Sequence, residues 1–267
     1  MALHVISSDE RNSPTMLLRR ILRRAAPQPS VRAIPSGRRV YAIGDIHGCL
    51  DLLDRLLTRI REDDRGRTPA ETQLIFLGDL VDRGPDSCGV VKRLMTLKAS
   101  GAAAVFLKGN HEEILIRTWE GDRRAATLLN RVGGRETLLS YGVTEEEYDA
   151  ADIDGLTKLV KHNVPEEHIA FLDAFTNWHE EGDYLFVHAG IRPGLCIEEQ
   201  NGSDLRWIRS AFLTHPGPHS HVVVHGHSIS DDVDEQVSRI GIDTGAFFSG
   251  TLTAIGLERA ERWYLTS

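Results

Sequence analysis

From residue 39 onward, short apolar runs alternate with longer stretches whose apolar residues recur at helical spacing. Three such pairs fill the first half of the chain. The predicted strands and the helices that follow them are 40–43 with 50–60, 74–77 with 86–98, and 103–107 with 111–119. Strands that alternate with helices are typical of α/β proteins.

Residues 120–180 break this pattern. They are polar, they keep helical spacing and they contain few strand signals, so we predict a helical insertion there. The alternation then resumes. The expected strands are 184–187, 222–224, 239–242 and 251–257, and a helix is expected at 205–213.

The N-terminal segment 1–38 mixes Ser, Pro and Arg. We interpret it as a basic tail in front of a domain at 39–267. Its residues 16–24 could form a short amphipathic helix on a membrane surface or a partner, although two turns bury little apolar area, which favours a partly disordered tail.

Charge and composition exclude several classes of protein. The net charge is −8, and residues 41–267 carry 23 basic and 37 acidic side chains, which disfavours nucleic-acid binding. Three cysteines without a CxxC pair disfavour a disulfide framework or a thiolate metal site. No apolar run reaches the ~18 residues of a membrane span. We therefore predict a cytoplasmic protein without a membrane span.

Five short motifs follow or flank the predicted strands and combine glycine with Asp, Asn or His. They are Gly44-Asp-Ile-His-Gly48, Gly78-Asp-Leu-Val-Asp-Arg-Gly84, Gly109-Asn-His-Glu112, His188-Ala-Gly190 and His225-Gly-His227. Loops at the carboxyl ends of strands are where functional groups converge in α/β sheets. So many polar groups beside a core would be costly unless a metal ion binds them.

The ligand types limit the choice of metal. Carboxylate oxygens, an amide oxygen and imidazoles, without thiolates, suit Mn²⁺, Fe²⁺ or Zn²⁺, and a shared carboxylate could bridge two ions. Two adjacent ions can activate a water and hold the oxygens of an in-line displacement at phosphorus. The pattern therefore predicts phosphoester chemistry.

The ordered motifs GDIHG, GDLVDRG, GNHE, HAG and HGH resemble the phosphoprotein phosphatase (PPP) branch of the calcineurin-like metallophosphoesterases, specifically its small bacterial and phage members. The resemblance implies a four-layer α/β/β/α sandwich with a helical insertion. It also implies a centre of two divalent metal ions, with Mn²⁺ preferred and Fe or Zn as alternatives. The implied metal ligands are Asp45 and His47 for the first ion, Asp79 as the bridge, and Asn110, His188 and His227 for the second.

The same resemblance assigns the acid. His111 matches the group that protonates the leaving alkoxide, and Asp82 matches its partner. Histidine can deliver a proton near neutral pH, and a nearby carboxylate raises its pKa. We expect His225 to support the site without being a ligand. Asp243 either orients a ligand or is part of a plain turn.

Phosphate binding is implied for Arg83, Asn110 and a second arginine. The Trp-x-Arg step at 207–209 nominates Arg209, with Arg206 as the alternative. Where many relatives have arginine before the GNHE motif, this chain has Lys108, which keeps the charge but lacks the bidentate fork.

The resulting hypothesis is a phosphatase that acts on phosphoserine and phosphothreonine in proteins by direct attack of a metal-bridging hydroxide. The alternative is a symmetrical diadenosine tetraphosphate hydrolase, which the run from Gly78 to Ser87 also resembles. Asp82 and Glu112 favour the protein-phosphatase branch. A catalytically silent phosphopeptide-binding module would lack ligands or the acid, and all are present.

Overall fold

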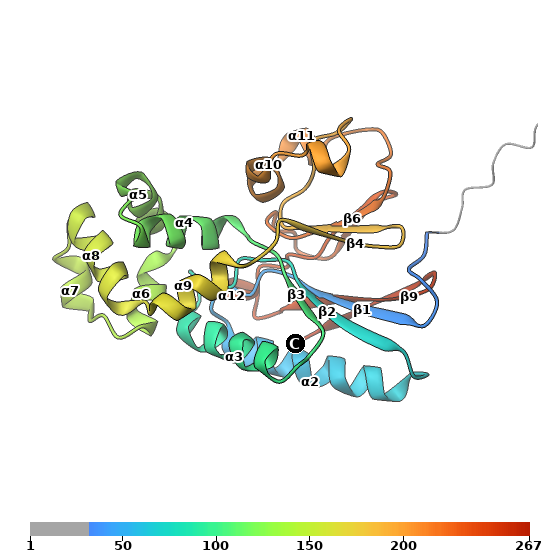
Figure 1. The fold of residues 1–267 in the computed structure, drawn as a ribbon, viewed down its shortest axis with the longest axis horizontal. Coiled ribbons are helices and arrows are strands. Elements are labelled where there is room, and N and C mark those ends of the chain that lie inside the picture. The colour runs from blue at the N-terminus through green and yellow to red at the C-terminus, as the bar shows by residue number, and fades with distance from the viewer. Residues whose placement is uncertain (1–31) are drawn as a thin grey trace, which may run out of the picture. The chain divides into compact units, whose positions relative to one another are not determined.

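The computed structural model describes residues 32–267, which form two sheets packed face to face (Figure 1). The first sheet has the strand order β10-β9-β1-β2-β3, in which β1, β2 and β3 are parallel and β9 and β10 are antiparallel to their neighbours. Its strands are β1 (Arg38–Ile43), β2 (Glu71–Phe76), β3 (Ala104–Phe106), β9 (Thr253–Glu258) and β10 (Glu261–Thr266).

The second sheet has the order β4-β5-β6-β8-β7. Its three central strands are parallel, so their carboxyl ends lie at one edge. The strands are β4 (Trp178–Glu181), β5 (Tyr184–Val187), β6 (Val222–His225), β7 (Asp234–Glu235) and β8 (Arg239–Gly241).

Alternating side chains along the buried strands fill two different cores. In β1, Tyr41 and Ile43 pack against the helices outside the first sheet, whereas Val40 and Ala42 pack into the space between the sheets. Successive side chains of a strand point to opposite faces, so a strand buried on both sides has apolar residues throughout. This explains why the central strands appear as continuous apolar runs in the sequence.

Helices cover both outer faces. Helices α2 (Leu50–Gly66) and α3 (Ser87–Ala99) cover the first sheet, and α10 (Gly202–Trp207) and α11 (Ser210–Leu213) cover the second (Figure 1). The helices on the second sheet pack against it through apolar side chains, since Val187 of β5 packs with Leu205 and Phe212. The four-layer α/β/β/α prediction is therefore confirmed.

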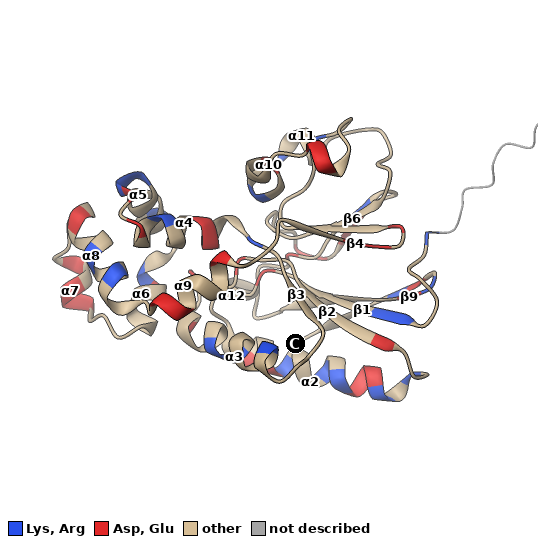
Figure 2. Ribbon diagram, viewed as in Figure 1, with Lys and Arg blue, Asp and Glu red and all other residues tan. Residues whose placement is uncertain are grey.

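Between α4 (Asn110–Trp119) and β4 lie further helices, which extend beside the sandwich in Figure 1. They are α5 (Arg123–Val132), α6 (Gly134–Ser140), α7 (Glu145–Asp149), α8 (Ile153–Asn163) and α9 (Glu166–Asp173). They occupy the region for which the sequence predicts a helical insertion. Figure 2 shows Asp and Glu gathered on α7, and both signs of charge mixed along α2.

The prediction of one helix at 205–213 is wrong. The chain is interrupted after α10, where Ile208 adopts an extended conformation (ψ 141°) and Arg209 has φ −131° and ψ −101°. Ile208 is buried in the apolar layer outside the second sheet, whereas Arg209 is exposed. The break thus turns Arg209 away from the core. The short 3₁₀ helix η1 (Ile197–Glu199) precedes this region, and α12 (Ala246–Ser249) follows β8.

The basic tail predicted at 1–38, with its amphipathic segment 16–24, lies outside the described residues except for 32–38. Within those residues, Ile34 is buried and donates its N–H to the carbonyl of Arg259 at 2.8 Å. None of the helices within 32–267 is long and apolar enough to cross a bilayer.

Candidate metal centre

The motif loops from both sheets meet at one edge of the sandwich. The loops after β1 and β2 and the start of α4 belong to the first sheet, and the loops after β5 and β6 belong to the second. The carboxyl ends of the parallel strands bring these loops together. The six predicted ligands are all buried, with exposed fractions of 6% or less: Asp45, His47, Asp79, Asn110, His188 and His227.

Asp79 lies between two groups of potential ligands. One group joins it to His47, whose Nε2 is 3.7 Å from Asp79 Oδ2, and the other joins it to His188 and His227. His188 Nε2 is 3.4 Å from Asp79 Oδ1 and 3.0 Å from Asn110 Oδ1. A carboxylate shared by two ligand groups is the arrangement that bridges two ions.

Backbone carbonyls fix the orientation of two imidazoles. His47 Nδ1 lies 2.8 Å from the Val81 carbonyl, and His188 Nδ1 lies 2.9 Å from that of Leu77. A carbonyl accepts only from an N–H, so Nδ1 carries the proton and Nε2 offers a lone pair to the site. Burial lowers the pKa of His47 to about 3, which keeps this imidazole neutral.

Several buried polar atoms at the site have no hydrogen-bond partner among the described residues: Asp45 Oδ1, His47 Nε2 and His227 Nε2. The other carboxylate oxygen of Asp45 accepts the backbone N–H of His227 at 3.0 Å. Buried polar atoms are nearly always paired, because an unpaired one costs about 1–3 kcal/mol. Lone pairs that converge without a donor fit a bound cation.

Two glycines allow the loops to approach this closely. A Cβ at Gly226 would lie 2.0 Å from Asp45 Oδ1, and a Cβ at Gly109 would lie 2.1 Å from Asp79 Oδ1. Any side chain at either position would therefore displace a carboxylate ligand. The glycines of the HGH and GNHE motifs are required by this contact.

His111 and Asp82 form a buried pair beside the ligands. His111 Nδ1 is 2.7 Å from Asp82 Oδ2, and Asp82 Oδ1 accepts the hydroxyl of Thr137 at 2.6 Å. The Asp82 N–H donates to Ser87 Oγ at 3.0 Å. Burial lowers the pKa of His111, but the Asp79 carboxylate and the bond to Asp82 outweigh it and raise the pKa above its ordinary value. Nδ1 of His111 thus faces the Asp82 carboxylate, whereas Nε2 faces the Arg83 guanidinium, whose charge, like burial, lowers the pKa.

The Arg83 side chain extends to His111. Its Nη2 lies 3.2 Å from His111 Nε2, and its guanidinium lies 5.0 Å from the ring centroid of Phe247. Its backbone N–H donates to the Gly133 carbonyl at 3.0 Å, which ties the loop to the additional helices. The guanidinium is placed where it could bind an oxygen of a phosphate at the metal centre.

The other basic candidates differ in their contacts. Arg206 donates to Glu113 Oε2 at 2.9 Å and also to Asn177, and Lys108 pairs with Asp173 at 2.7 Å. Arg209 is exposed, and no residue within 32–267 pairs with its side chain. Burial, the His188 ring and the Arg209 charge lower the pKa of His227 to about 2, so Arg209 lies near this ligand.

Glu112 contacts the site in a way that its motif did not predict. This buried carboxylate accepts three backbone N–H groups, from Gly109 at 2.8 Å, Asp79 at 2.8 Å and Leu80 at 2.7 Å. It lies at the third position of α4 and reaches back to the residue before the helix, which is a capping pattern. That pattern was the available signal, although it does not reveal the bonds to the Asp79 loop.

Asp243 and His225 lie just outside the ligand set. Asp243 Oδ1 accepts the N–H of Gly245 at 3.0 Å, whereas Oδ2 has no partner among residues 32–267. Burial and the charges of the Asp243 and Asp79 carboxylates raise the pKa of Asp45. His225 Nδ1 lies 3.0 Å from the Gly226 carbonyl, beside the loop that carries His227. The contact that Asp243 makes is that of a turn, and a supporting role for either residue stays a prediction.

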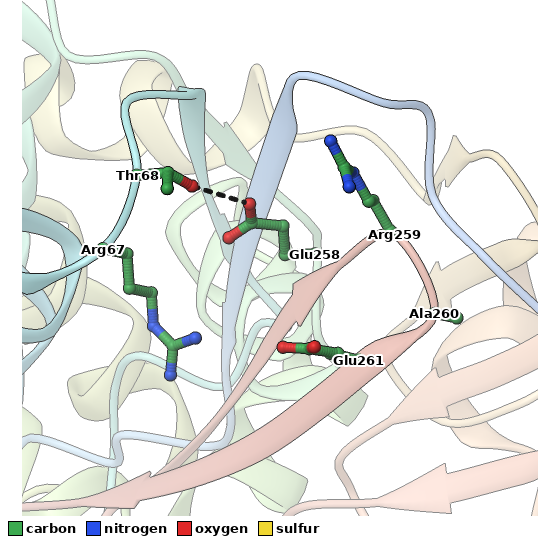
Figure 3. A pocket seen from close by; sticks show the side chains of 6 residues that line it. All are labelled: Arg67, Thr68, Glu258, Arg259, Ala260 and Glu261. Carbon is green, nitrogen blue, oxygen red and sulfur yellow. Dashed lines mark hydrogen bonds between the residues drawn. The ribbon is translucent and has the colours of Figure 1, made fainter.

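A separate cavity of about 510 Å³ lies at the β9–β10 turn (Figure 3). The turn is at the amino end of β1, opposite the metal loops, because Leu257 pairs with Val40 in antiparallel register. The cavity combines two arginines with two glutamates, and Thr68 donates to Glu258 at 3.4 Å. Its charges are balanced and it has no link to the ligand groups.

Comparisons with known proteins agree with this geometry. The family model for calcineurin-like phosphoesterases matches residues 38–246. A symmetrical bis(5'-nucleosyl)-tetraphosphatase of Acidovorax sp. (strain JS42) is 34% identical over 160 residues, which is 60% of this chain and 47% of that protein. The chain thus spans about half the length of this relative.

Two further matches cover nearly the whole domain. An asymmetrical bis(5'-nucleosyl)-tetraphosphatase of Anoxybacillus flavithermus is 30% identical over 233 residues, which is 80% of this chain and 88% of that protein. The solved structure of a putative diadenosine tetraphosphatase has a TM-score of 0.58 and 22% identity, and the match covers 90% of this chain and 96% of that one. The structural match extends the shared fold to both sheets.

Proposed function

The chain belongs to the calcineurin-like phosphoesterase family, and on that premise we propose that it hydrolyses dinucleoside polyphosphates at a dinuclear metal centre. The observation that carries the reaction is Asp79, which is shared by two groups of buried histidines. The choice of substrate is supported by the relatives, which are named for dinucleoside tetraphosphates.

The donor set fits two divalent ions. His47, Asp45 and Asp79 would hold the first, and Asn110, His188 and His227 would join Asp79 around the second. Oxygen and imidazole ligands without thiolates fit Mn²⁺, and they also accept Fe or Zn. When bound, such ions supply positive charge to phosphate oxygens and lower the pKa of a bound water.

His111 is close enough to His47 and Asp79 to be counted among ligands, yet we assign it the acid role. Its Nδ1 is held by Asp82, and the Arg83 guanidinium lies 3.2 Å from its Nε2. The guanidinium can only donate, so Nε2 accepts in this contact and carries no proton while the contact lasts. A phosphate that binds Arg83 would replace this contact and leave Nε2 free to take up a proton beside Asp79 and Asp82. His111 would therefore hold a proton at Nε2 for the oxygen that leaves.

Arg83 and Asn110 would bind the phosphate that reacts, and Arg209, whose charge acts on the ligand His227, would bind it as well. Guanidinium groups match phosphate oxygens in a bidentate fashion. Arg206 and Lys108 are less suitable, because each is already paired with a carboxylate.

A second candidate is hydrolysis of phosphoserine and phosphothreonine in proteins, the function that the sequence analysis preferred. The His111–Asp82 pair favours it, because an alkoxide leaves only if it receives a proton, whereas a nucleotide leaves as a stabilised anion. The relatives favour the dinucleotide. A catalytically silent phosphopeptide-binding module is not supported, because such a module would lack ligands or the acid and this chain has all of these residues. Cytoplasmic localisation and partners that are phosphorylated proteins stay predictions.

A direct comparison of substrates tests the proposal. With Mn²⁺ present, kcat/KM is measured for diadenosine tetraphosphate and for phosphoserine, phosphothreonine and phosphotyrosine peptides. We expect the dinucleotide to be preferred, with product analysis distinguishing symmetrical from asymmetrical cleavage. A preference for the phosphopeptides would overturn the proposal and restore the protein-phosphatase assignment.

A further inference from the structure

Two segments beside the metal centre, the loop after β6 and the segment 243–250 that contains α12, expose large apolar side chains. Three of the five exposed large hydrophobic residues within 32–267 lie on them: Ile229, Phe247 and Phe248. The two segments contact each other, because the Ser230 N–H donates to the Asp243 carbonyl at 3.1 Å. Exposed apolar side chains gathered next to a site are commonly binding surfaces.

Phe247 joins this surface to the phosphate-binding arginine. Its ring meets the ring of His47 edge to face, with 5.6 Å between centroids, and lies 5.0 Å from the guanidinium carbon of Arg83. A phosphate held by Arg83 would therefore lie within a few ångströms of an aromatic ring. A group attached to that phosphate would leave the centre across Phe247.

Phe248 is fixed in place although it is 62% exposed. Helix α12 lies between Gly245 (φ 66°) and Gly250 (φ 72°), both in the left-handed region that favours glycine. A Cβ at Gly245 would lie 2.2 Å from Phe248 Cε1, so the ring rests directly on the glycine backbone. The two phenylalanine centroids are 5.2 Å apart. The two rings thus form one aromatic surface that Phe248 exposes to solvent.

We propose that Phe247 and Phe248 form a platform on which a base of the nucleotide substrate stacks while its phosphates are bound at Arg83. This inference rests on the proposed function and names the surface that recognises the nucleoside. A purine base is planar and apolar on its faces, and stacking on an aromatic side chain tolerates every base. The platform would recognise a nucleoside that is linked to phosphate, whichever base it carries.

The test compares two ligands that differ by a nucleoside. ADP and pyrophosphate are measured as competitive inhibitors of p-nitrophenyl phosphate hydrolysis, in the unmodified protein and in Phe248→Ala. We expect the inhibition constant of ADP to rise about 10-fold in Phe248→Ala, in line with the loss of one stacked base, while that of pyrophosphate stays unchanged. Isothermal titration of ADP gives a second measure that needs no turnover.

Two control variants separate stacking from general effects. Phe248→Tyr keeps an aromatic ring and should restore ADP affinity. Val237→Ala removes another exposed apolar side chain, which is 94% exposed in the link between β7 and β8, and should change neither constant. The platform is overturned if Phe248→Ala leaves the ADP constant unchanged, or if it raises both constants equally.

The result can be told apart from a failure of the proposed function. If the unmodified protein does not hydrolyse diadenosine tetraphosphate, the proposed function fails, yet the ratio of the ADP and pyrophosphate constants still tests the platform. If the dinucleotide is hydrolysed and that ratio is the same in Phe248→Ala, the function stands and the platform fails.

Discussion

At the scale of single residues, the functional side chains stand on a strained backbone. Among residues 32–267, six residues other than glycine have φ in the left-handed region, and five of them belong to the site: His47, Asp79, Asp82, Arg83 and His227. Such conformations cost of order 1–3 kcal/mol each and persist only where the surroundings enforce them. The loops therefore give up stability to point these side chains at one centre.

The role of His111 predicts a dependence on the leaving group. Replacing His111 with Asn should lower kcat for an alkyl phosphate by about 10²–10⁴-fold, because the alkoxide loses its proton donor. The loss should be much smaller for an aryl phosphate or for diadenosine tetraphosphate, whose leaving groups are stable as anions. The measurement is kcat for the three substrates with the same enzyme preparation. Equal losses for all three would remove His111 from the acid role.

The two arginines near α10 predict opposite phenotypes. Arg209→Ala should lower kcat/KM by about 10–100-fold, the worth of a hydrogen bond to a charged group, and leave Tm unchanged because the side chain is exposed and unpaired within 32–267. Arg206→Ala should lower Tm and change kcat/KM little, because it leaves the half-buried Glu113 without its guanidinium. Kinetics and thermal melts of both variants check this. The reverse pattern would make Arg206 the phosphate ligand.

At the scale of elements, helix α4 positions the centre through its first turn. Glu112 accepts N–H groups from the loop before α4 and from the loop after β2, so one carboxylate joins the parts of the chain that carry Asn110 and Asp79. Burial and the Asp79 carboxylate raise the pKa of Glu112 against the lowering effect of these N–H groups. The N–H groups thus hold the Glu112 carboxylate close to the predicted metal ligands, although Glu112 is not itself one of the predicted ligands.

Removing that carboxylate should weaken metal binding without removing a ligand. Glu112→Ala should reduce the apparent Mn²⁺ affinity by about 10–100-fold, as loss of an outer contact to a ligand typically does, and excess Mn²⁺ should recover part of kcat. Glu120→Ala, an exposed glutamate at the other end of α4, is the matched control and should behave as the unmodified protein. Activity measured against Mn²⁺ concentration decides. Unchanged metal dependence in Glu112→Ala would contradict the positioning role.

Much of the fold was predictable, because its buried strands and amphipathic helices carry strong patterns. The strand Val222–His225 is wholly apolar until its last residue, and α2 repeats leucine at helical spacing. Elements with weaker patterns were missed: β4 has the sequence Trp-His-Glu-Glu and β10 begins with charged residues at the edge of its sheet. The break at Ile208 depends on burial against the second sheet, which no local pattern reveals.

The site was predictable to a similar degree. The motifs predicted which side chains are buried together at the edge of the sandwich, since Asp, Asn and His directly follow apolar strands. The bonds from Glu112 to Leu80 and from Thr137 to Asp82 join residues 32 and 55 positions apart. Phe247 likewise contacts His47 across 200 positions of sequence. Contacts of this kind arise from tertiary packing, so short-range spacing cannot predict them.

At the scale of the whole domain, the candidate centre joins the two sheets. Asp45, His47 and Asp79 follow strands of the first sheet, whereas His188 and His227 follow strands of the second. Apolar side chains fill the space between the two sheets, whereas acids and imidazoles lie between them at this edge. Asp45, Asp79 and Asp243 are all buried. Burial and the charges of the other two raise the pKa of Asp45, so their negative charge is unfavourable without a cation. Metal binding should therefore stabilise the folded sandwich, in addition to its role in the reaction.

Removal of metal should accordingly lower the thermal stability of the protein. An ion present at 100 times its Kd stabilises the folded state by about 2.7 kcal/mol, which corresponds to about 5–10 °C in Tm for a domain of this size. We expect EDTA to lower Tm by this amount and added Mn²⁺ to restore it. Asp79→Asn should abolish most of the shift, because Asp79 is shared by both ligand groups, whereas Glu146→Gln, an exposed acid on α7, should leave it intact. Differential scanning calorimetry in EDTA and in Mn²⁺ measures all three proteins. A shift that survives Asp79→Asn would place the stabilising ion elsewhere, and the dinuclear assignment would then fail together with the mechanism built on it.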